Sequence, residues 1–279
     1  MAGPRLSAVV MCFNEKRVIG RCLDALAFCD EIVVVDDCST DGTWELLQQR
    51  ADVRPFQHRH TTFAAQRQYG KDRATGDWIL TMDADETVTP ALARRIRETI
   101  ARADAADVYE IRRINPYPRT LDGHFWTKHP RLVRAEKCRW VVTDDPHSPL
   151  DTQGLRVAIL EGAHLDHEPL PDVATMLRKN INRSLIVAAL DRSKGREGGL
   201  LSLLGSSLGR FFKYYVREGA WRFGADGLIF AAACGFEAFA KQAFLVERQD
   251  RPLEQMQDGG PGSYPAGTTF VSGKGEKAA

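Results

Sequence analysis

The chain of 279 residues lacks the sequence patterns that mark several common functional classes. Its six cysteines form no C-x-x-C pair, so the sequence predicts neither a zinc site nor a thiol redox motif. It contains no G-x-x-x-x-G-K-[ST] and no G-x-G-x-x-G, which excludes the P-loop and dinucleotide-binding variants. Charge of one sign is also lacking. Since 38 Lys and Arg face 37 Asp and Glu, the net charge is +1, and we expect no nucleic-acid partner.

Long apolar runs free of charge are absent as well. Leu228–Val246 is apolar over 19 residues but contains Glu237 and Lys241. Each charge at the centre of a bilayer would cost about 2.5–3.5 kcal/mol, which argues against a transmembrane span. Because Met1–Arg5 leads directly into an apolar run, we expect no signal peptide and a cytoplasmic, reduced protein.

The first hundred residues alternate between apolar runs and helix-like segments. The expected strands are Leu6–Cys12, Glu31–Asp36, Val53–Phe56 and Asp77–Asp83. The expected helices are Val18–Leu26 with Asn14 as its cap, Thr43–Ala51, Phe63–Ala74, and a helix that starts at Thr89-Pro90 and runs to about Ala103. Strands separated by helices of this length indicate right-handed crossovers and a parallel sheet. The sequence therefore predicts an α/β, Rossmann-like fold, with a mainly parallel sheet flanked by helices.

The pattern changes after Asp107. The segments 107–114 and 130–140 are typical of strands in a more irregular sheet, and 172–189 is typical of a helix. Leu200–Arg217 is amphipathic, with an apolar stripe and a second stripe that contains Arg210, Lys213 and Arg217. In residues 252–279, nine of 28 are Gly or Pro, which predicts a disordered tail. We expect a catalytic domain over 1–170, a C-terminal amphipathic helical extension over 171–251, and this tail.

Acidic residues follow two of the expected strands. Asp36 and Asp37 end the second strand, and Asp83, Asp85 and Glu86 end the fourth. In an open parallel sheet ligands bind beyond the carboxyl ends of the strands. On an extended segment Asp83 and Asp85 would face the same way, and their repulsion would favour a hard cation such as Mg²⁺ or Mn²⁺. The alternative is that these acids are caps and solvated loop charges.

The runs VVMCFNE, EIVVVDDCSTDGT and AAQRQYGKDRATGDWILTMDADE, in this order and spacing, resemble family 2 glycosyltransferases with the GT-A fold. The likeness is strong over about residues 5–100, and it continues more weakly through RLVRAEKCRW, the His147 segment, His164 and the two C-terminal apolar stretches. We expect nucleotide-sugar binding over 5–105 and the acceptor side over 106–170. The weaker part is similar to the lipopolysaccharide core β-1,4-glucosyltransferases. The resemblance implies an inverting hexosyltransferase that uses a nucleotide sugar, commonly UDP-linked.

The resemblance also implies residue roles. It assigns the nucleotide base to Asp37 and Phe13, the ribose to Asp83, and the divalent cation to Asp83 and Asp85, with His164 as a further ligand and His167 as its competitor. The remaining implied donor-binding residues are Asn14, Glu15, Asp36 and Arg67. Structural roles stay open for these positions: Phe13 as the end of a core strand, Arg67 on a solvated helix face, and His164 as a structural histidine.

The segment expected to carry the catalytic base departs from the family pattern. Relatives read V-H-E after a tryptophan-containing strand, whereas this chain has His147 followed by Ser148. Asp145, or Asp144, is our candidate for the carboxylate that takes the proton of the acceptor hydroxyl, with His147 beside it. Asp144-Asp145-Pro146 is equally an ordinary turn signal.

The C-terminal third is basic. Met176–Arg251 holds 13 Lys and Arg against seven Asp and Glu, and its basic residues lie beside apolar helix faces. Within the glycosyltransferase interpretation, this favours peripheral association with an anionic membrane, at the cytoplasmic face of the inner membrane, and a lipid-linked saccharide acceptor. Helices that pack on the catalytic domain, with a solvated basic stripe, are the alternative.

Two other functional classes stay open from the sequence. Carboxylates at sheet ends also serve Mg²⁺-dependent nucleotidyltransferases and phosphotransferases. Ser148 leaves open a catalytically inactive, membrane-associated relative that binds a nucleotide sugar.

Overall fold

The computed structural model describes residues 3–59, 62–114, 126–141, 150–168 and 172–247. The chain divides into two compact units. The first contains the described residues up to Glu168, and the second contains those from Asp172 onward. The predicted tail, 252–279, lies outside the described residues.

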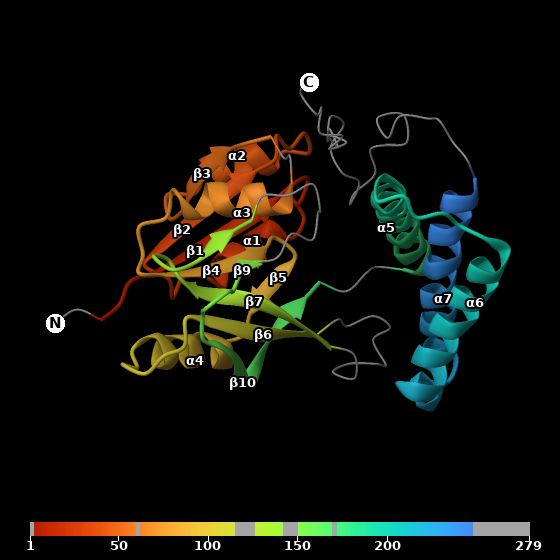
Figure 1. The fold of residues 1–279 in the computed structure, drawn as a ribbon. Coiled ribbons are helices and arrows are strands. Elements are labelled where there is room, and N and C mark those ends of the chain that lie inside the picture. Colours follow the sequence, from red (N-terminus) through yellow and green to blue (C-terminus); the bar gives the residue numbers. More distant parts are fainter. Residues whose placement is uncertain (1–2, 60–61, 115–125, 142–149, 169–171, 248–279) are drawn as a thin grey trace, which may run out of the picture. The chain divides into compact units, whose positions relative to one another are not determined.

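The first unit is built on one large sheet (Figure 1). Its strands are β1 (Leu6–Cys12), β2 (Glu31–Asp36), β3 (Arg54–Gln57), β4 (Trp78–Asp83), β5 (Glu86–Val88), β6 (Val108–Ile114), β7 (Trp126–Arg134) and β10 (Val157–His167). They lie in the order β3-β2-β1-β4-β7-β6-β10-β5. A second, two-stranded sheet pairs β8 (Arg139–Trp140) with β9 (Leu150–Asp151).

The first four large strands are parallel, as predicted, and the rest of the sheet is mixed. β1 pairs with both β2 and β4 in parallel, and β3 extends the sheet beyond β2. β7 is antiparallel to β4 and to β6, whereas β6 and β10 are parallel. This mainly parallel sheet, flanked by helices and followed by further helices in the chain, confirms the predicted α/β, Rossmann-like fold.

Apolar side chains on both faces of the sheet form the core of this unit. Along β1, Ala8 and Val10 lie in one buried cluster and Val9 lies in another, so the strand is covered on both sides. The helices of the unit are α1 (Ile19–Asp24), α2 (Thr43–Gln48), α3 (Phe63–Lys71) and α4 (Pro90–Ile100). α1, α2 and α4 contribute to the first cluster and α3 to the second, which explains why β1, β2 and β4 read as unbroken apolar runs.

Some predicted boundaries are wrong for local reasons. Asn14 does not cap α1, whose N-cap is Val18; the Asn14 side-chain oxygen accepts from the Thr40 N–H instead. The predicted strand 130–140 is two strands in different sheets, since β7 ends at Arg134. β5 and β10 were not predicted. α4 does begin at Pro90, as expected, and the Thr89 hydroxyl caps it by accepting from the Leu92 N–H at 3.2 Å.

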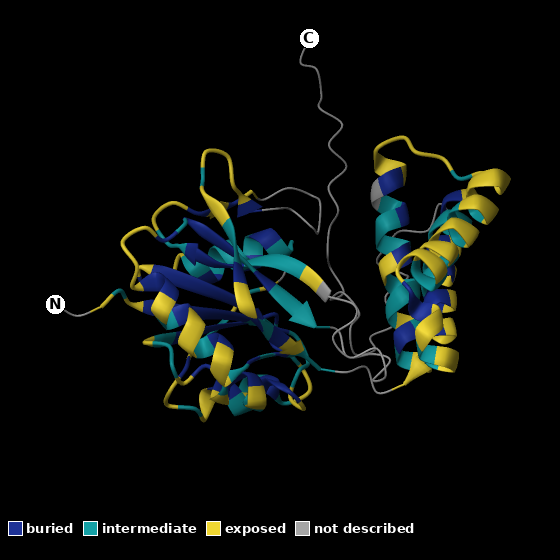
Figure 2. Ribbon diagram, turned by 90° about the horizontal axis from the view of Figure 1, so that it is seen from below, coloured by how far each residue is buried: buried dark blue, intermediate teal, exposed yellow. Residues whose placement is uncertain are grey.

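The second unit consists of helices only, within the residues described. They are α5 (Val173–Ser193), α6 (Leu200–Phe212) and α7 (Gly224–Val246), and both α5 and α6 pack on α7. The predicted helix 200–217 changes at Lys213 into a π-helical turn, Lys213–Arg217, and a 3-10 turn, Ala220–Phe223, precedes α7. In Figure 2 much of α6 is exposed, whereas the large sheet of the first unit is largely buried.

Candidate active site

Two loops at the carboxyl ends of β1 and β2 are fastened to each other. The Asn14 N–H donates to the Ser39 hydroxyl at 2.8 Å, and the Asn14 side-chain oxygen accepts from the Thr40 N–H at 2.8 Å. The Glu15 N–H donates to the Thr43 hydroxyl at 3.0 Å. Asn14 and Cys38 both have left-handed backbones, with φ of 54° and 58°. A left-handed backbone is uncommon for residues other than glycine, and such residues are found more often at functional sites. Here the hydrogen bonds between the two loops stabilise it.

The two acids at the end of β2 differ in their surroundings. Asp36 is fully buried, and its carboxylate accepts from the Ser39 N–H at 3.0 Å and from the Gln57 side chain at 3.1 Å. Asp36 therefore holds the loop together. Asp37 is 5% exposed, and its N–H donates to the Cys12 carbonyl oxygen at 3.0 Å. Phe13, half-buried, follows the end of β1. The two loops thus place Phe13, Asp36 and Asp37, all predicted to bind the donor, at one edge of the sheet.

The D-x-D segment is a tight turn between β4 and β5 and not an extended segment. Asp83 ends β4, Ala84 and Asp85 form the turn, and Glu86 begins β5. The alternation argument for a shared direction of Asp83 and Asp85 therefore does not apply. The two carboxylates have different partners: arginines contact Asp83, and a histidine contacts Asp85.

Three arginines surround Asp83 and Glu86. Arg131 Nη2 lies 2.7 Å from Asp83 and also contacts Glu86, which is fully buried. Arg67 Nη2 lies 3.3 Å from Asp83. Arg113 Nη1 lies 3.3 Å from Glu86 and 4.0 Å from Asp83. Three guanidinium groups thus face two carboxylates, and the cluster carries an excess of positive charge.

The protonation of the cluster follows from burial and these charges. Burial raises the pKa of Asp83, but Arg131 and Arg67 outweigh burial and hold that pKa well below its usual range. For His129, on β7, burial and the charges of Arg131 and Arg113 lower the pKa to about 4. His129 is therefore neutral at pH 7, and its Nε2 lies 2.9 Å from the Thr127 hydroxyl.

Pairing of β5 with β10 brings a histidine to Asp85. β10 runs antiparallel to β5, with His167 opposite Glu86. His167 Nε2 lies 3.1 Å from the Asp85 carboxylate, and both side chains are largely buried. The Glu168 N–H donates to the Asp85 carbonyl oxygen at 2.8 Å, while the Glu168 carboxylate pairs with Arg17 at 2.9 Å. These contacts fix the turn that carries Asp85.

His164 lies elsewhere on β10. Its Nε2 is 3.2 Å from Asp166, and both side chains are more than 40% exposed. Of the two histidines weighed in the sequence, the structure thus brings His167 and not His164 to the D-x-D turn. Within the described residues, no group of three or more His, Cys, Asp and Glu side chains is placed to hold a metal ion.

Arg113 and Arg131 were missed in the sequence. A signal was present, because Arg131 directly precedes Leu132 and Val133 in a run with strand character, and an arginine buried in such a run needs acidic partners. Asp144, Asp145 and His147, the candidates for base chemistry, lie outside the described residues.

The chain resembles both a protein family as a whole and individual known proteins. The model of glycosyl transferase family 2 matches residues 7–150. The lipopolysaccharide core biosynthesis glycosyltransferase LpsC of Rhizobium meliloti (strain 1021) is 29% identical over 254 residues, covering 87% of this chain and 92% of LpsC. The succinoglycan biosynthesis protein ExoO of the same organism is 36% identical over 110 residues, covering 37% of this chain and 31% of ExoO.

Solved structures of low sequence identity also align. Mannosyltransferase PcManGT from Pyrobaculum calidifontis, in complex with GDP-Man and Mn²⁺, aligns with a TM-score of 0.47 at 18% identity, covering 87% of this chain and 74% of that one. S. aureus TarS 1-349, in complex with UDP-GlcNAc, aligns with a TM-score of 0.45 at 14% identity, covering 84% and 91%. Because the family model spans more than half of the sequence, the chain belongs to glycosyl transferase family 2.

Proposed function

We propose that this protein transfers a hexose from a nucleotide sugar, UDP-linked, to a membrane-anchored glycolipid such as lipopolysaccharide core, with inversion at the anomeric carbon. The observation that carries the proposal is the D-x-D turn after β4, where Asp85 meets His167 and Asp83 meets three arginines. The similarity to LpsC over 87% of the chain supports the acceptor class.

The fastened loops after β1 and β2 would hold the nucleotide. Asp37 accepts a hydrogen bond from the imide N–H of the base, while Phe13, Asn14 and Glu15 line the same edge. Asp36 does not contact the nucleotide but positions the loop that does, since its carboxylate accepts hydrogen bonds from Ser39 and Gln57. Asp83 contacts the ribose, held in place by Arg67 and Arg131.

Asp85 and His167 fit a divalent cation, Mg²⁺ or Mn²⁺. They supply one carboxylate and one imidazole at 3.1 Å from each other, and such cations complete their coordination with water and substrate phosphates. When bound, the cation neutralises charge on the diphosphate leaving group. The positive excess of Arg67, Arg113 and Arg131 over Asp83 and Glu86 adds to the same effect.

Sugar transfer needs a base on the acceptor side. We assign it to Asp145, with Asp144 as the alternative and His147 beside them. The carboxylate takes the proton of the acceptor hydroxyl as that oxygen attacks the anomeric carbon. The bond from the anomeric carbon to the diphosphate oxygen breaks, and the nucleoside diphosphate leaves with its electron pair.

The acceptor class places the reaction at the cytoplasmic face of the inner membrane. The basic excess of Met176–Arg251 supports an anionic surface as partner. Of the predicted basic stripe, however, Arg210 forms an ion pair with Glu237 at 3.2 Å, so its charge is already compensated within the protein.

The test measures Mn²⁺-dependent binding of UDP-sugars by calorimetry in Asp85→Asn and His167→Gln. We expect each change to weaken binding at least about tenfold, the lower end of what changes near metal ligands cost. His164→Gln and Asp104→Asn are the matched controls, since His164 contacts Asp166 and the exposed Asp104 contacts Arg102. Equal binding in His167→Gln and His164→Gln would remove His167 from the site.

Product analysis separates the other functional classes. A glycosyltransferase releases the nucleoside diphosphate and leaves no phosphate on the acceptor, whereas a phosphotransferase or nucleotidyltransferase leaves a phosphate group on the acceptor. Asp145→Asn should bind donor normally and transfer no sugar. Donor binding without transfer in the unaltered protein, across a panel of glycolipid acceptors, would instead identify an inactive relative.

A further inference from the structure

The exposed surface of α7 is apolar along the whole helix. Beyond Gly224, every exposed position of α7 carries an apolar residue. These positions are Ala225, Leu228, Ile229, Ala232, Phe236, Phe239 and Val246. At about 100° per residue, they fall within an arc about 100° wide. The buried positions of α7 are held mainly by small residues such as Ala231, Ala233 and Gly235. Large side chains thus face outward and small ones inward.

α6 presents a similar stripe. None of its side chains is buried, although the helix is rich in leucine. Its large exposed apolar residues, with Val216 of the following turn, are Leu200, Leu201, Leu204, Leu208, Phe212 and Val216. A helix on a soluble protein turns such a stripe toward the core. Here the stripe faces away from α7.

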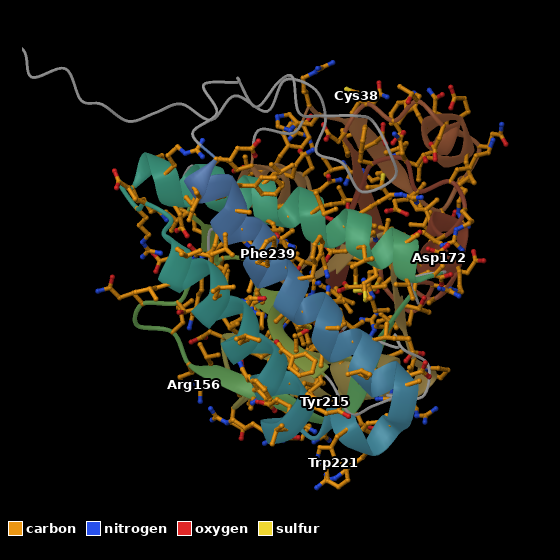
Figure 3. The ribbon with its side chains drawn as sticks, turned by 90° about the vertical axis from the view of Figure 1, so that its right-hand side faces the viewer. Cys38, Arg156, Asp172, Tyr215, Trp221 and Phe239 are labelled. Atoms are coloured by element: carbon orange, nitrogen blue, oxygen red, sulfur yellow. The ribbon has the colours of Figure 1, made fainter. Side chains whose placement is uncertain are left out.

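Both stripes lie on the same side of the α6–α7 pair. Arg210 of α6 and Glu237 of α7 form an ion pair at 3.2 Å, which marks one side. On each helical wheel the exposed apolar arc lies away from that residue, at about 80–180° from Glu237 and about 80–180° from the Arg210 position. The pair of helices therefore has one charged side and one apolar side. Figure 3 shows Phe239 on α7, and Trp221 at the turn that joins the helices.

Polar groups face the inside of this helical unit. The Ser207 hydroxyl donates to the Gly235 carbonyl oxygen at 3.0 Å, and a Cβ at Gly235 would lie 3.1 Å from the Ser207 carbonyl oxygen. From α5, the Asn180 amide donates to the Ala233 carbonyl oxygen at 3.2 Å. Small residues at close helix contacts, together with hydrogen bonds between helices, are typical of helices packed in lipid.

The charges that argued against lipid burial are paired inside the unit. Glu237 lies 3.2 Å from Arg210 and 3.5 Å from Arg183, and Lys241 lies 3.1 Å from Asp191. The sequence argument counted Glu237 and Lys241 as single charges. Residues 220–246 are also long and apolar enough to cross a membrane. The charged side nevertheless favours an orientation in the membrane plane over a span.

We propose that the α6–α7 pair is embedded in one leaflet of a bilayer, with its apolar side among the lipid acyl chains. The occupant is lipid and not protein, because the exposed arc of α7 offers no polar atom of a side chain to a partner, whereas protein interfaces have polar rims and direct hydrogen bonds. Trp221, 54% exposed at the turn, has the amphipathic ring that the membrane interface prefers. Attachment then depends on apolar contact more than on anionic lipid.

Flotation with vesicles of neutral phosphatidylcholine tests this with the full chain. We expect the unaltered protein to float at low salt and equally in 1 M NaCl. Phe236→Ser with Phe239→Ser should reduce the bound fraction about tenfold or more, because two large apolar side chains are lost from the contact. The matched control, Lys213→Gln with Arg217→Gln, removes two charges and should bind within about twofold of the parent.

Four outcomes would overturn the proposal. Binding that needs anionic lipid and is lost in 1 M NaCl would indicate electrostatic attachment. Failure to float, with a dimer in light scattering, would assign the apolar side to a second copy of the chain, and failure to float as a monomer would assign it to the first unit. If the serine variant does not fold, the unaltered protein can be bound to vesicles whose lipids carry photoactivatable acyl chains. These lipids should label peptides of α6 and α7, and absence of that label would contradict the proposal. The vesicles contain no acceptor, so these results leave the sugar-transfer proposal untouched.

Discussion

Arg131 is the residue on which the D-x-D turn depends most directly. It reaches the site from β7 and contacts both Asp83 and Glu86, and its side chain is 3% exposed. The sequence pattern could not predict that Arg131 lies beside these acids, because β7 comes from a distant part of the chain and enters the sheet between β4 and β6. The acids themselves were predictable, since they directly follow a strand whose register is fixed by burial on both faces.

Replacing Arg131 should cost more stability than any exposed ion pair does. Arg131→Met leaves the buried Glu86 with Arg113 as its remaining ion-pair partner among the described residues, and breaking a buried pair costs about 3–5 kcal/mol. Urea unfolding measures this loss. The control is Arg102→Met, which breaks the exposed pair with Asp104 and should change the free energy of unfolding by about 0.5 kcal/mol or less. Equal effects of the two changes would mean that the cluster does not support the fold.

His129 should make stability depend on pH. Its pKa is about 4 in the folded protein, below the usual value of about 6.5, because burial and two arginines disfavour the charged ring. The unfolded chain therefore binds the proton first as the pH falls, and stability is lost between about pH 6.5 and 4. His129→Gln should show a shallower fall in unfolding free energy from pH 7 to pH 5, by at most about 1.4 kcal/mol per pH unit. Parallel curves for parent and variant would contradict this.

At the level of elements, prediction succeeded where both faces of a strand are covered. β1 and β2 were predicted to the residue, because burial on both faces requires an unbroken apolar run. β10 was missed because its buried and exposed residues follow no regular alternation, and its register shifts between Ile159 and His164, around Gly162, whose φ is 83°. β5 has three residues, too few for a pattern. The sequence therefore located the Asp83–Asp85 segment and offered His167 only as the competitor of His164, and it is the pairing of β10 with β5 that selects His167.

α3 should be sensitive to a single methyl group at its contact with the sheet. A Cβ at Gly70 would lie 2.4 Å from Val9 Cγ1 and 3.0 Å from Val35 Cγ2. Gly70→Ala should therefore destabilise the protein by about 1–3 kcal/mol, despite the better helix propensity of alanine. It should also weaken donor binding, because Arg67 lies one turn earlier on the same helix. Gly20→Ala is the control in α1, where no atom lies within 4 Å, and it should be neutral or stabilising by up to about 1 kcal/mol.

At the scale of the whole molecule, the two units bury their apolar residues differently. The first unit has covered strands such as β1, whose residues are almost all buried. The second leaves the leucines of α6 exposed and turns small residues inward. The sequence predicted an amphipathic extension with an apolar stripe and a basic stripe, but it did not show which of the two stripes is free to contact a membrane. That distinction needed the ion pairs between Arg210 and Glu237 and between Lys241 and Asp191, which join residues far apart in sequence.

The two units should therefore differ in the rate at which their backbone amides exchange hydrogen. Amides exchange through local opening, and a helix with few buried side chains opens at low cost. In lipid-free buffer we expect the amides of α6 to exchange much faster than those of β1 and β4, which are buried on both faces. Neutral vesicles should slow exchange in α6 and α7 and leave β1 unchanged, because lipid covers only the exposed apolar stripes. If α6 is already as protected as β1 without lipid, its leucines are covered in solution by protein, and a lipid-facing role for them would be wrong.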